Sequence, residues 1–124
     1  MASALITRVE DNILIVYPQA VRIIDETQIQ EVTDELLELV NSTKLERMLI
    51  NFSTVNFMGS AMIGKLILLN KKCKAMHLDL RFCGMNANIL EVFKLMKLDT
   101  VFQIYGEESE AIKSFKDRKK KWYV

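Results

Sequence analysis

Short apolar runs alternate with longer segments of helical periodicity along the chain, and this alternation limits the fold more than any other feature. The runs at residues 13–16, 48–50 and 78–83 have the length and composition of buried strands. Strands that alternate with helices pack as a mainly parallel sheet with helices against it. The sequence therefore predicts an α/β fold, with a mixed, mostly parallel sheet of about five strands and four packed helices.

The helical segments are recognised by their caps and apolar stripes. Asp25 is the expected N-cap of the first helix, with Gln28 at the capping-box spacing. Ser60, after Gly59, is the expected N-cap of the second. The stripe of this second helix is Met62, Leu66, Leu69, Cys73 and Met76. In chain order we expect two strands within 5–17, a helix at 25–42, a strand at 47–52, a connector at 53–58, a helix from 60, a strand at 78–83, a helix around 89–96, a strand at 101–105 and a helix from about 107.

Length and charge define the class of protein. The 124 residues suit one domain, residues 1–124, that ends in a basic tail at 116–124. Seventeen cations against sixteen anions predict no nucleic-acid binding. No signal peptide is recognised, and the most apolar stretch, 62–69, is shorter than the roughly 20 residues of a membrane span. We expect a cytoplasmic protein without stable membrane insertion, whose tail is a solvated helix end or, alternatively, attracts anionic lipid or RNA.

The residue types that most catalytic and metal sites need are sparse. His77 is the only histidine and falls between a helix and a strand, as a solvated loop residue would. Cys73 and Cys83 lie far apart and are expected to pack as small apolar side chains. No phosphate-binding glycine motif and no nucleophile elbow occurs. The sequence predicts a protein that is not an enzyme and carries no cofactor and no metal.

One segment has a specific resemblance. The stretch LINFSTVNFMGSAMIG at residues 49–64 resembles the signature of the STAS family, which comprises the bacterial anti-sigma-factor antagonists and related domains of sulphate transporters. That signature ends in Asp-Ser-Ser-Gly-Leu-Gly at a helix start, and Ser60 and Gly64 keep its residues. Gly59 stands where the family has aspartate. The segments 80–84, 93–102 and 107–111 also resemble the family, so the resemblance covers nearly the whole chain as a single STAS-like domain.

The resemblance implies a regulatory protein-interaction module. Its partner would be an anti-sigma factor that is also a serine kinase, bound while Ser60 is unmodified and released when Ser60 is phosphorylated. A phosphate at a helix start meets unpaired N–H groups and the positive end of the helix dipole, so the domain can hold it without unfolding. The expected partner-binding residues are Met58, Gly59, Ser60, Ala61, Met62 and Gly64.

Several alternatives stay open. Ser60 is also explained as a plain N-cap. Met58 and Met62 form either an adaptable contact surface or part of the core. Gly64 either permits close helix packing, the favoured interpretation, or leaves a flat spot for docking. The whole domain is alternatively a non-phosphorylated scaffold in a larger signalling complex, with a homodimer as one form of self-assembly, or a binder of ligand or lipid.

Overall fold

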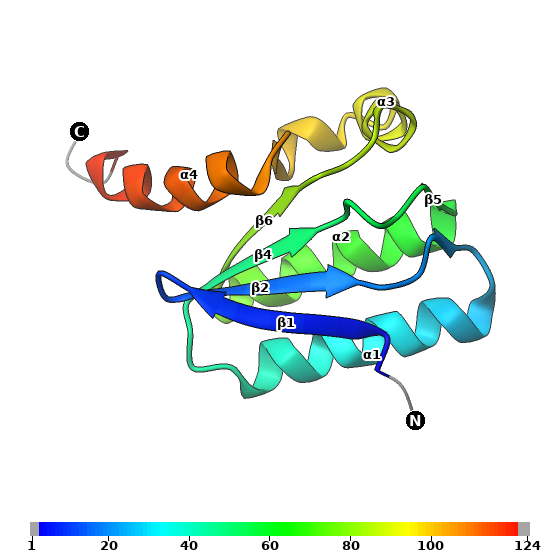
Figure 1. The fold of residues 1–124 in the computed structure, drawn as a ribbon, viewed down its shortest axis with the longest axis horizontal. Helices are drawn as coiled ribbons and strands as arrows, with labels where there is room; N and C mark the ends of the chain where they lie inside the picture. The colour runs from blue at the N-terminus through cyan, green and yellow to red at the C-terminus, as the bar shows by residue number, and fades with distance from the viewer. Residues whose placement is uncertain (1–2, 122–124) are drawn as a thin grey trace.

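A five-stranded sheet forms the centre of the molecule (Figure 1). The computed structural model describes the backbone of residues 3–121 and the side chains as far as Lys116. Across the sheet the strands are β1 (Leu5–Glu10), β2 (Ile13–Pro18), β4 (Arg47–Asn51), β6 (Asp79–Cys83) and β7 (Gln103–Tyr105). β1 is antiparallel to β2, and the other neighbours are parallel. The predicted α/β class and mixed, mostly parallel sheet are confirmed.

Helices cover both faces of this sheet. α1 (Glu26–Ser42) and α2 (Ser60–Ala75) pack on one face, and α4 (Glu108–Lys121) packs on the other. The short α3 (Ala87–Leu95) lies beyond the carboxyl ends of the parallel strands and continues into a 3-10 turn at Leu98–Thr100. Because helices cover β2 on both faces, Leu14 and Val16 pack toward α1 and α2, while Ile13 and Ile15 pack toward α4.

Two local signals of the sequence have the expected geometry. Asp11 and Asn12 both adopt positive φ, 53° and 62°, which is the two-residue turn that joins β1 to β2. Asp25 is the N-cap of α1, and its carboxylate accepts a hydrogen bond from the Gln28 amide at 2.8 Å. The Gln28 side chain in turn accepts one from the Ile24 amide at 3.1 Å. The first helix is therefore capped as predicted.

A second, two-stranded sheet was not predicted. β3 (Arg22–Ile23) pairs in parallel with β5 (Phe57–Met58), inside segments that the sequence indicated as loop and connector. Two residues are too few to establish a strand period, so the pattern carried no signal. The last strand is also shorter than expected, since it begins at Gln103, after the 3-10 turn. At the end of the α2 stripe, Met76 is exposed, because the helix ends at Ala75.

Two glycines allow a matched test of the backbone. Gly84 ends β6 with φ of +77°, and a Cβ there would lie 2.7 Å from Asn51 Oδ1 and 3.0 Å from Ser53 N. Gly64 lies inside α2, where a Cβ would meet nothing within 4 Å. We expect Gly84→Ala to lower the free energy of unfolding by about 2–3 kcal/mol. Gly64→Ala should raise it by about 1 kcal/mol.

Urea denaturation followed by circular dichroism measures both glycine variants. Equal effects of the same sign at Gly84 and Gly64 would contradict this description of the two backbone positions.

Candidate functional site

The candidate site lies where α2 begins, at the end of the molecule reached by the carboxyl ends of β2, β4 and β6 (Figure 1). Open α/β sheets commonly bind their ligands at this edge. Ser60 is the first residue of α2 and is exposed. The predicted position of Ser60 at a helix start is therefore correct, and its side chain faces solvent.

The predicted N-cap role of Ser60 is wrong by one residue. Gly59 is the N-cap, with extended φ and ψ of −75° and 162°. The Gly59 carbonyl accepts hydrogen bonds from the Met62 and Ile63 amides, at 3.0 and 3.2 Å. Ser60 is therefore the first residue inside the helix, and not the residue that caps it. Glycine supplies no capping side chain, and no side-chain hydrogen bond caps this helix. The first turn of α2 also lacks an acidic residue.

The small β3–β5 sheet fixes the start of α2. The Gly59 amide donates to the Ile23 carbonyl at 2.9 Å, and the Asn56 amide donates to the Val21 carbonyl at 2.7 Å. Ile23 and Met58 are buried beneath this pairing. The segment that carries Ser60 is therefore hydrogen-bonded to the segment that leads into α1, although the two are far apart in the sequence.

The six expected site residues divide into a buried and an accessible set. The structure buries the Met58 and Met62 side chains in the core, which is the alternative left open for both. Ser60 and Ala61 are exposed and Gly64 is half-buried, on the outer side of α2. The favoured interpretation of Gly64, close helix packing, is wrong, because a Cβ at this position would meet nothing within 4 Å. The accessible surface is thus a helix start of small residues, followed by an exposed Leu68.

A groove runs between this helix start and α1. Its volume is about 620 Å³. Acidic residues of α1, namely Glu26, Glu31 and Asp34, line it together with Ala61 and Lys65 of α2. The cation of Lys65 is thus the one positive charge among the lining residues. On its α1 side, the site presents negative charge.

The two cysteines and the histidine lie in the environments that the sequence predicted for them. Cys73 and Cys83 are free and buried, and burial raises the pKa of their thiols to about 11 and about 12. His77 is exposed, at a positive φ of 57°. Among the described side chains, at residues 3–116, no three of His, Cys, Asp or Glu lie close enough together to hold a metal ion. No helix in the described part of the chain has the length and apolar character needed to cross a membrane.

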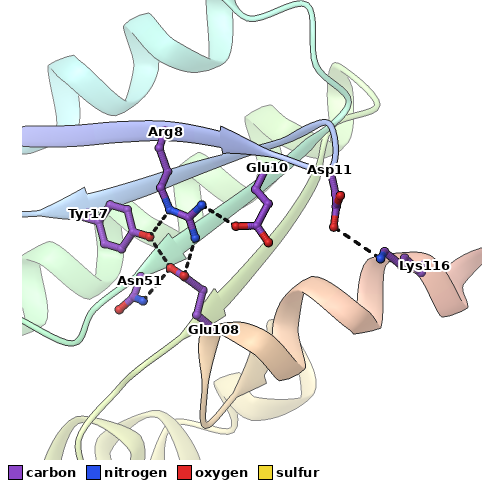
Figure 2. A network of polar contacts seen from close by, with 7 residues as sticks. All are labelled: Arg8, Glu10, Asp11, Tyr17, Asn51, Glu108 and Lys116. Atoms are coloured by element: carbon purple, nitrogen blue, oxygen red, sulfur yellow. Dashed lines mark hydrogen bonds and ion pairs between the residues drawn. The ribbon is translucent and has the colours of Figure 1, made fainter.

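A polar cluster that sequence reasoning missed joins α4 to the other face of the sheet (Figure 2). The Glu108 carboxylate accepts hydrogen bonds from Tyr17 Oη, from Asn51 Nδ2 at 3.1 Å and from Arg8 Nη2 at 2.6 Å. Burial acts to raise the pKa of Glu108, but these three hydrogen bonds outweigh it and lower the pKa below 4.5. The cluster holds the first turn of α4 in place, on the side of the sheet away from α1 and α2.

The predicted basic tail lies mostly outside the described side chains. Of its residues, Lys116 is described, with Nζ 3.4 Å from Asp11 Oδ2 at the β1–β2 turn (Figure 2). Both side chains are largely exposed, so this ion pair adds little stability.

Comparison with known proteins identifies the family. A family model described as the STAS domain matches residues 4–111. This chain belongs to the STAS domain family.

Solved structures support the same conclusion at the level of the fold. An anti-sigma factor antagonist from Mycobacterium paratuberculosis has a TM-score of 0.80 and 18% identity, covering 91% of this chain and 93% of that one. A STAS domain protein from Planctomyces limnophilus has a TM-score of 0.76 and 21% identity, covering 89% and 96%. The unphosphorylated antagonist SpoIIAA, from Bacillus, has a TM-score of 0.71 and 15% identity, covering 94% and 96%.

Proposed function

We propose that this chain is an anti-sigma-factor antagonist that binds a serine-kinase anti-sigma factor and is switched by phosphorylation of Ser60. The observation that carries the proposal is that Ser60 is exposed at the first position of α2, among small residues. A kinase can reach a side chain in this position without local unfolding. The likeness to SpoIIAA, whose structure is known in unphosphorylated and phosphorylated forms, supports the same function.

The switch follows from charge at a fixed surface. A phosphate adds about −1.5 to −2 charges and strong acceptor oxygens. The free N–H groups in the first turn of α2 and the positive end of its dipole accommodate that charge. Because β3 and β5 hold the helix start, the domain keeps its fold and the surface gains negative charge at Ser60. Juxtaposed like charges across an interface cost several kcal/mol, which is enough to release a partner.

Binding to a purified kinase tests the proposal. The probe is the histidine-kinase-like serine kinase encoded nearest to the gene for this chain, and calorimetry measures its affinity for wild type, Ser60→Ala and Ser60→Asp. We expect Ser60→Ala to bind as wild type does. Ser60→Asp should bind at least about 100-fold more weakly, which corresponds to about 2.8 kcal/mol.

Ser109 provides a matched control for the serine switch. It is also an exposed serine in the first turn of a helix, α4, on the other face of the sheet. Ser109→Asp should bind the kinase as wild type does. Mass spectrometry after incubation with the kinase and Mg-ATP should place a phosphate on Ser60 alone. Tight binding by Ser60→Asp, or phosphate elsewhere and not on Ser60, contradicts the proposed switch.

A non-phosphorylated scaffold is the second candidate function. It is favoured by Gly59, which stands where the family has aspartate, and by the absence of any acidic residue from the first turn of α2. A scaffold of this kind works through the same exposed surface in a larger signalling complex. Ser60 that remains unphosphorylated with the kinase and ATP, combined with undiminished kinase binding by Ser60→Asp, supports the scaffold and contradicts the switch.

A further inference from the structure

The sheet has an open edge at β1 (Figure 1). No described strand pairs with the outer side of β1, and its residues from Ile6 to Glu10 are all exposed. Proteins commonly protect an edge strand by making it short, by a bulge, by proline or by a covering element. The opposite edge strand, β7, has three residues, whereas β1 has six, without proline and in one continuous register with β2. β1 is therefore the accessible edge of this sheet.

The register of the β1–β2 hairpin determines which backbone groups of β1 are free. The residues on either side of a two-residue turn form a hydrogen-bonded pair, and such pairs alternate along an antiparallel ladder. Because Glu10 closes the turn, the even-numbered residues of β1 point their N–H and C=O groups toward β2. The Gln19 amide, which donates to the Ala4 carbonyl at 3.0 Å, agrees with this alternation. The backbone groups of Thr7 and Val9 consequently point away from β2.

The outward groups at the start of β1 are already occupied. Ser3 Oγ accepts a hydrogen bond from the Leu5 amide at 3.2 Å and lies 2.8 Å from the Leu5 carbonyl oxygen. Within the described part of the chain, Thr7 and Val9 have no equivalent partner on the outer side. Free N–H and C=O groups at every second residue of an edge strand are a template for another strand.

A groove follows this edge on the side of α1. Its volume is about 750 Å³. Three glutamates and five uncharged residues line it, namely Ser3, Leu5, Thr7, Glu31, Glu35, Glu38, Leu39 and Ser42. Among the described side chains, none that lines the groove is basic. α1 itself has five acidic residues and no basic one. The groove is therefore strongly negative.

The carboxylates of the groove remain charged. Burial acts to raise the pKa of Glu35, but hydrogen bonds, chiefly from Ser3 and the Ala4 amide, outweigh it and lower the pKa below 4.5. Glu31 and Glu38 are exposed and extend the negative charge on both sides of Glu35 along α1. Basic side chains of a partner would find these carboxylates ionised at neutral pH.

The charged side chains of β1 do not reverse this potential. Arg8 binds Glu10 at 2.5 Å and Glu108 at 2.6 Å, on the α4 side of the sheet (Figure 2). These three residues together have a net charge of −1, from one cation and two anions. The Arg8 guanidinium also lies over the face of the sheet, so it does not cover the edge.

The cations near the β1–β2 turn lie outside the groove. Lys44 and Arg47 line a separate hollow at this turn, together with Glu46. Lys116 pairs with Asp11 in the turn. Along the groove itself the negative charge is unopposed by any described lining residue, so complementary potential favours a basic partner.

A second copy of the chain does not suit this edge. Two β1 strands pair antiparallel about a two-fold axis perpendicular to the sheet, and this axis leaves α1 of both copies on the same face. The acidic grooves of the two copies would then lie on either side of one seam. Juxtaposed like charges disfavour that arrangement, so the occupant is a different protein.

We infer that β1 binds an extended segment of a partner protein as an additional antiparallel strand, whose basic residues face α1. Antiparallel pairing is favoured because it is slightly more stable per residue than parallel pairing. Alternate side chains of the added strand then lie over the acidic groove. This surface contains none of the six residues expected around Ser60, so the inference goes beyond the proposed switch and does not depend on it.

A short synthetic peptide of alternating lysine and valine tests the inference on the full-length protein. The matched peptide has glutamate in place of each lysine. Fluorescence anisotropy measures both affinities, and NMR measures hydrogen exchange at the amides of Thr7 and Val9. We expect the lysine peptide to bind at least about tenfold more tightly and to slow the exchange of both amides. Equal affinities, or unchanged exchange at Thr7 and Val9, overturn the inference.

N-methylation of the peptide separates strand pairing from simple charge attraction. In antiparallel pairing the lysines lie opposite Thr7 and Val9, so the lysine amides point toward β1 and the valine amides point toward solvent. Methylation of the lysine amides should weaken binding at least about tenfold, because each methyl group replaces a hydrogen-bond donor. Methylation of the valine amides should leave the affinity unchanged. Equal affinities of the two methylated peptides, or the reverse order, contradict antiparallel pairing at β1.

Protein variants locate the binding site. Glu38→Lys should weaken the lysine peptide at least about fivefold, because it removes one attraction and adds a repulsion. Glu91→Lys makes the same change at an exposed glutamate of another helix, α3, and should bind as wild type does. Circular dichroism verifies that both variants are folded. Wild-type affinity in folded Glu38→Lys, or equal losses in both variants, overturns the inference.

Sedimentation tests the alternative occupant, a second copy. Thr7→Pro removes an outward N–H and leaves the β1–β2 ladder intact, as proline does on edge strands. We expect wild type and Thr7→Pro to sediment identically, and the lysine peptide to bind Thr7→Pro more weakly than wild type. A wild-type dimer that Thr7→Pro dissociates would assign the edge to a second copy and overturn the inference.

Discussion

Replacing Phe82 by alanine is expected to lower the free energy of unfolding by about 3–5 kcal/mol, the range for large aromatic side chains in a core. Phe82 lies on β6, an interior strand of the sheet, and is fully buried. Its ring contacts three others, with centroid distances of 5.2 Å to Phe52, 6.5 Å to Phe93 and 4.7 Å to Phe102. These rings come from the end of β4, from α3 and from the segment before β7. Phe82 thus joins the sheet to the part of the chain beyond it.

The effect of Phe82→Ala is measurable because domains of this size are stable by only about 5–15 kcal/mol. Urea denaturation followed by circular dichroism gives the difference in unfolding free energy. Phe57→Ala is the matched control, because Phe57 is an aromatic residue that is about half exposed. It should cost less than about 1 kcal/mol, chiefly through the lost contact with Arg22. Equal losses in both variants would show that the four-ring cluster is not the centre of the core.

Replacing Asp79 by alanine is expected to cost about 3–5 kcal/mol, as in other proteins where one partner of a buried ion pair is removed. The Asp79 carboxylate binds Arg81 Nε and Nη2, each at 3.1 Å. Their side chains are 12% and 6% exposed. Among the side chains that the structure describes, the remaining partners of Arg81 are neutral: Ser114 Oγ at 2.9 Å, Tyr105 Oη at 3.2 Å and the Phe115 ring at 4.6 Å. Without Asp79 the cation stays buried under α4 with no counterion among its described contacts.

A double variant and an exposed pair distinguish this explanation from a general loss of packing. Asp79→Ala combined with Arg81→Met removes both charges and should recover most of the lost stability. Glu10→Ala breaks the Arg8–Glu10 pair, whose side chains are 41% and 44% exposed, and should cost less than about 1 kcal/mol. Chemical denaturation measures all three variants. A double variant less stable than Asp79→Ala would contradict the buried-charge explanation.

The sheet was predictable because its strands carry their own signals. The four buried residues 13–16 require cover on both faces, and the helical segments between and after the strands supply that cover. The hairpin turn at Asp11 and Asn12 and the cap at Asp25 depend on neighbours only a few residues away. Such local chemistry can be recognised in a sequence. The position of Ser60 at the start of α2 was predictable for the same reason.

The missed features depend on segments that are distant in sequence. The β3–β5 pairing joins residues 22–23 to 57–58. The N-cap of α2 is Gly59, which directly follows β5, and not Ser60 as predicted. The Glu108 cluster combines residues from β1, β2, β4 and α4. Arg81 is buried because α4 lies over it, which strand alternation alone does not indicate.

The β3–β5 pairing has a consequence for the thermodynamics of recognition. A surface built from free loops loses conformational entropy when a partner orders it, and this loss weakens binding. Here the residues before Ser60 are already held, by the Gly59 to Ile23 and Asn56 to Val21 hydrogen bonds. Association at this end of the molecule therefore requires little additional ordering of the backbone. A modest contact area can then support specific binding, and a single added charge can be sufficient to reverse it.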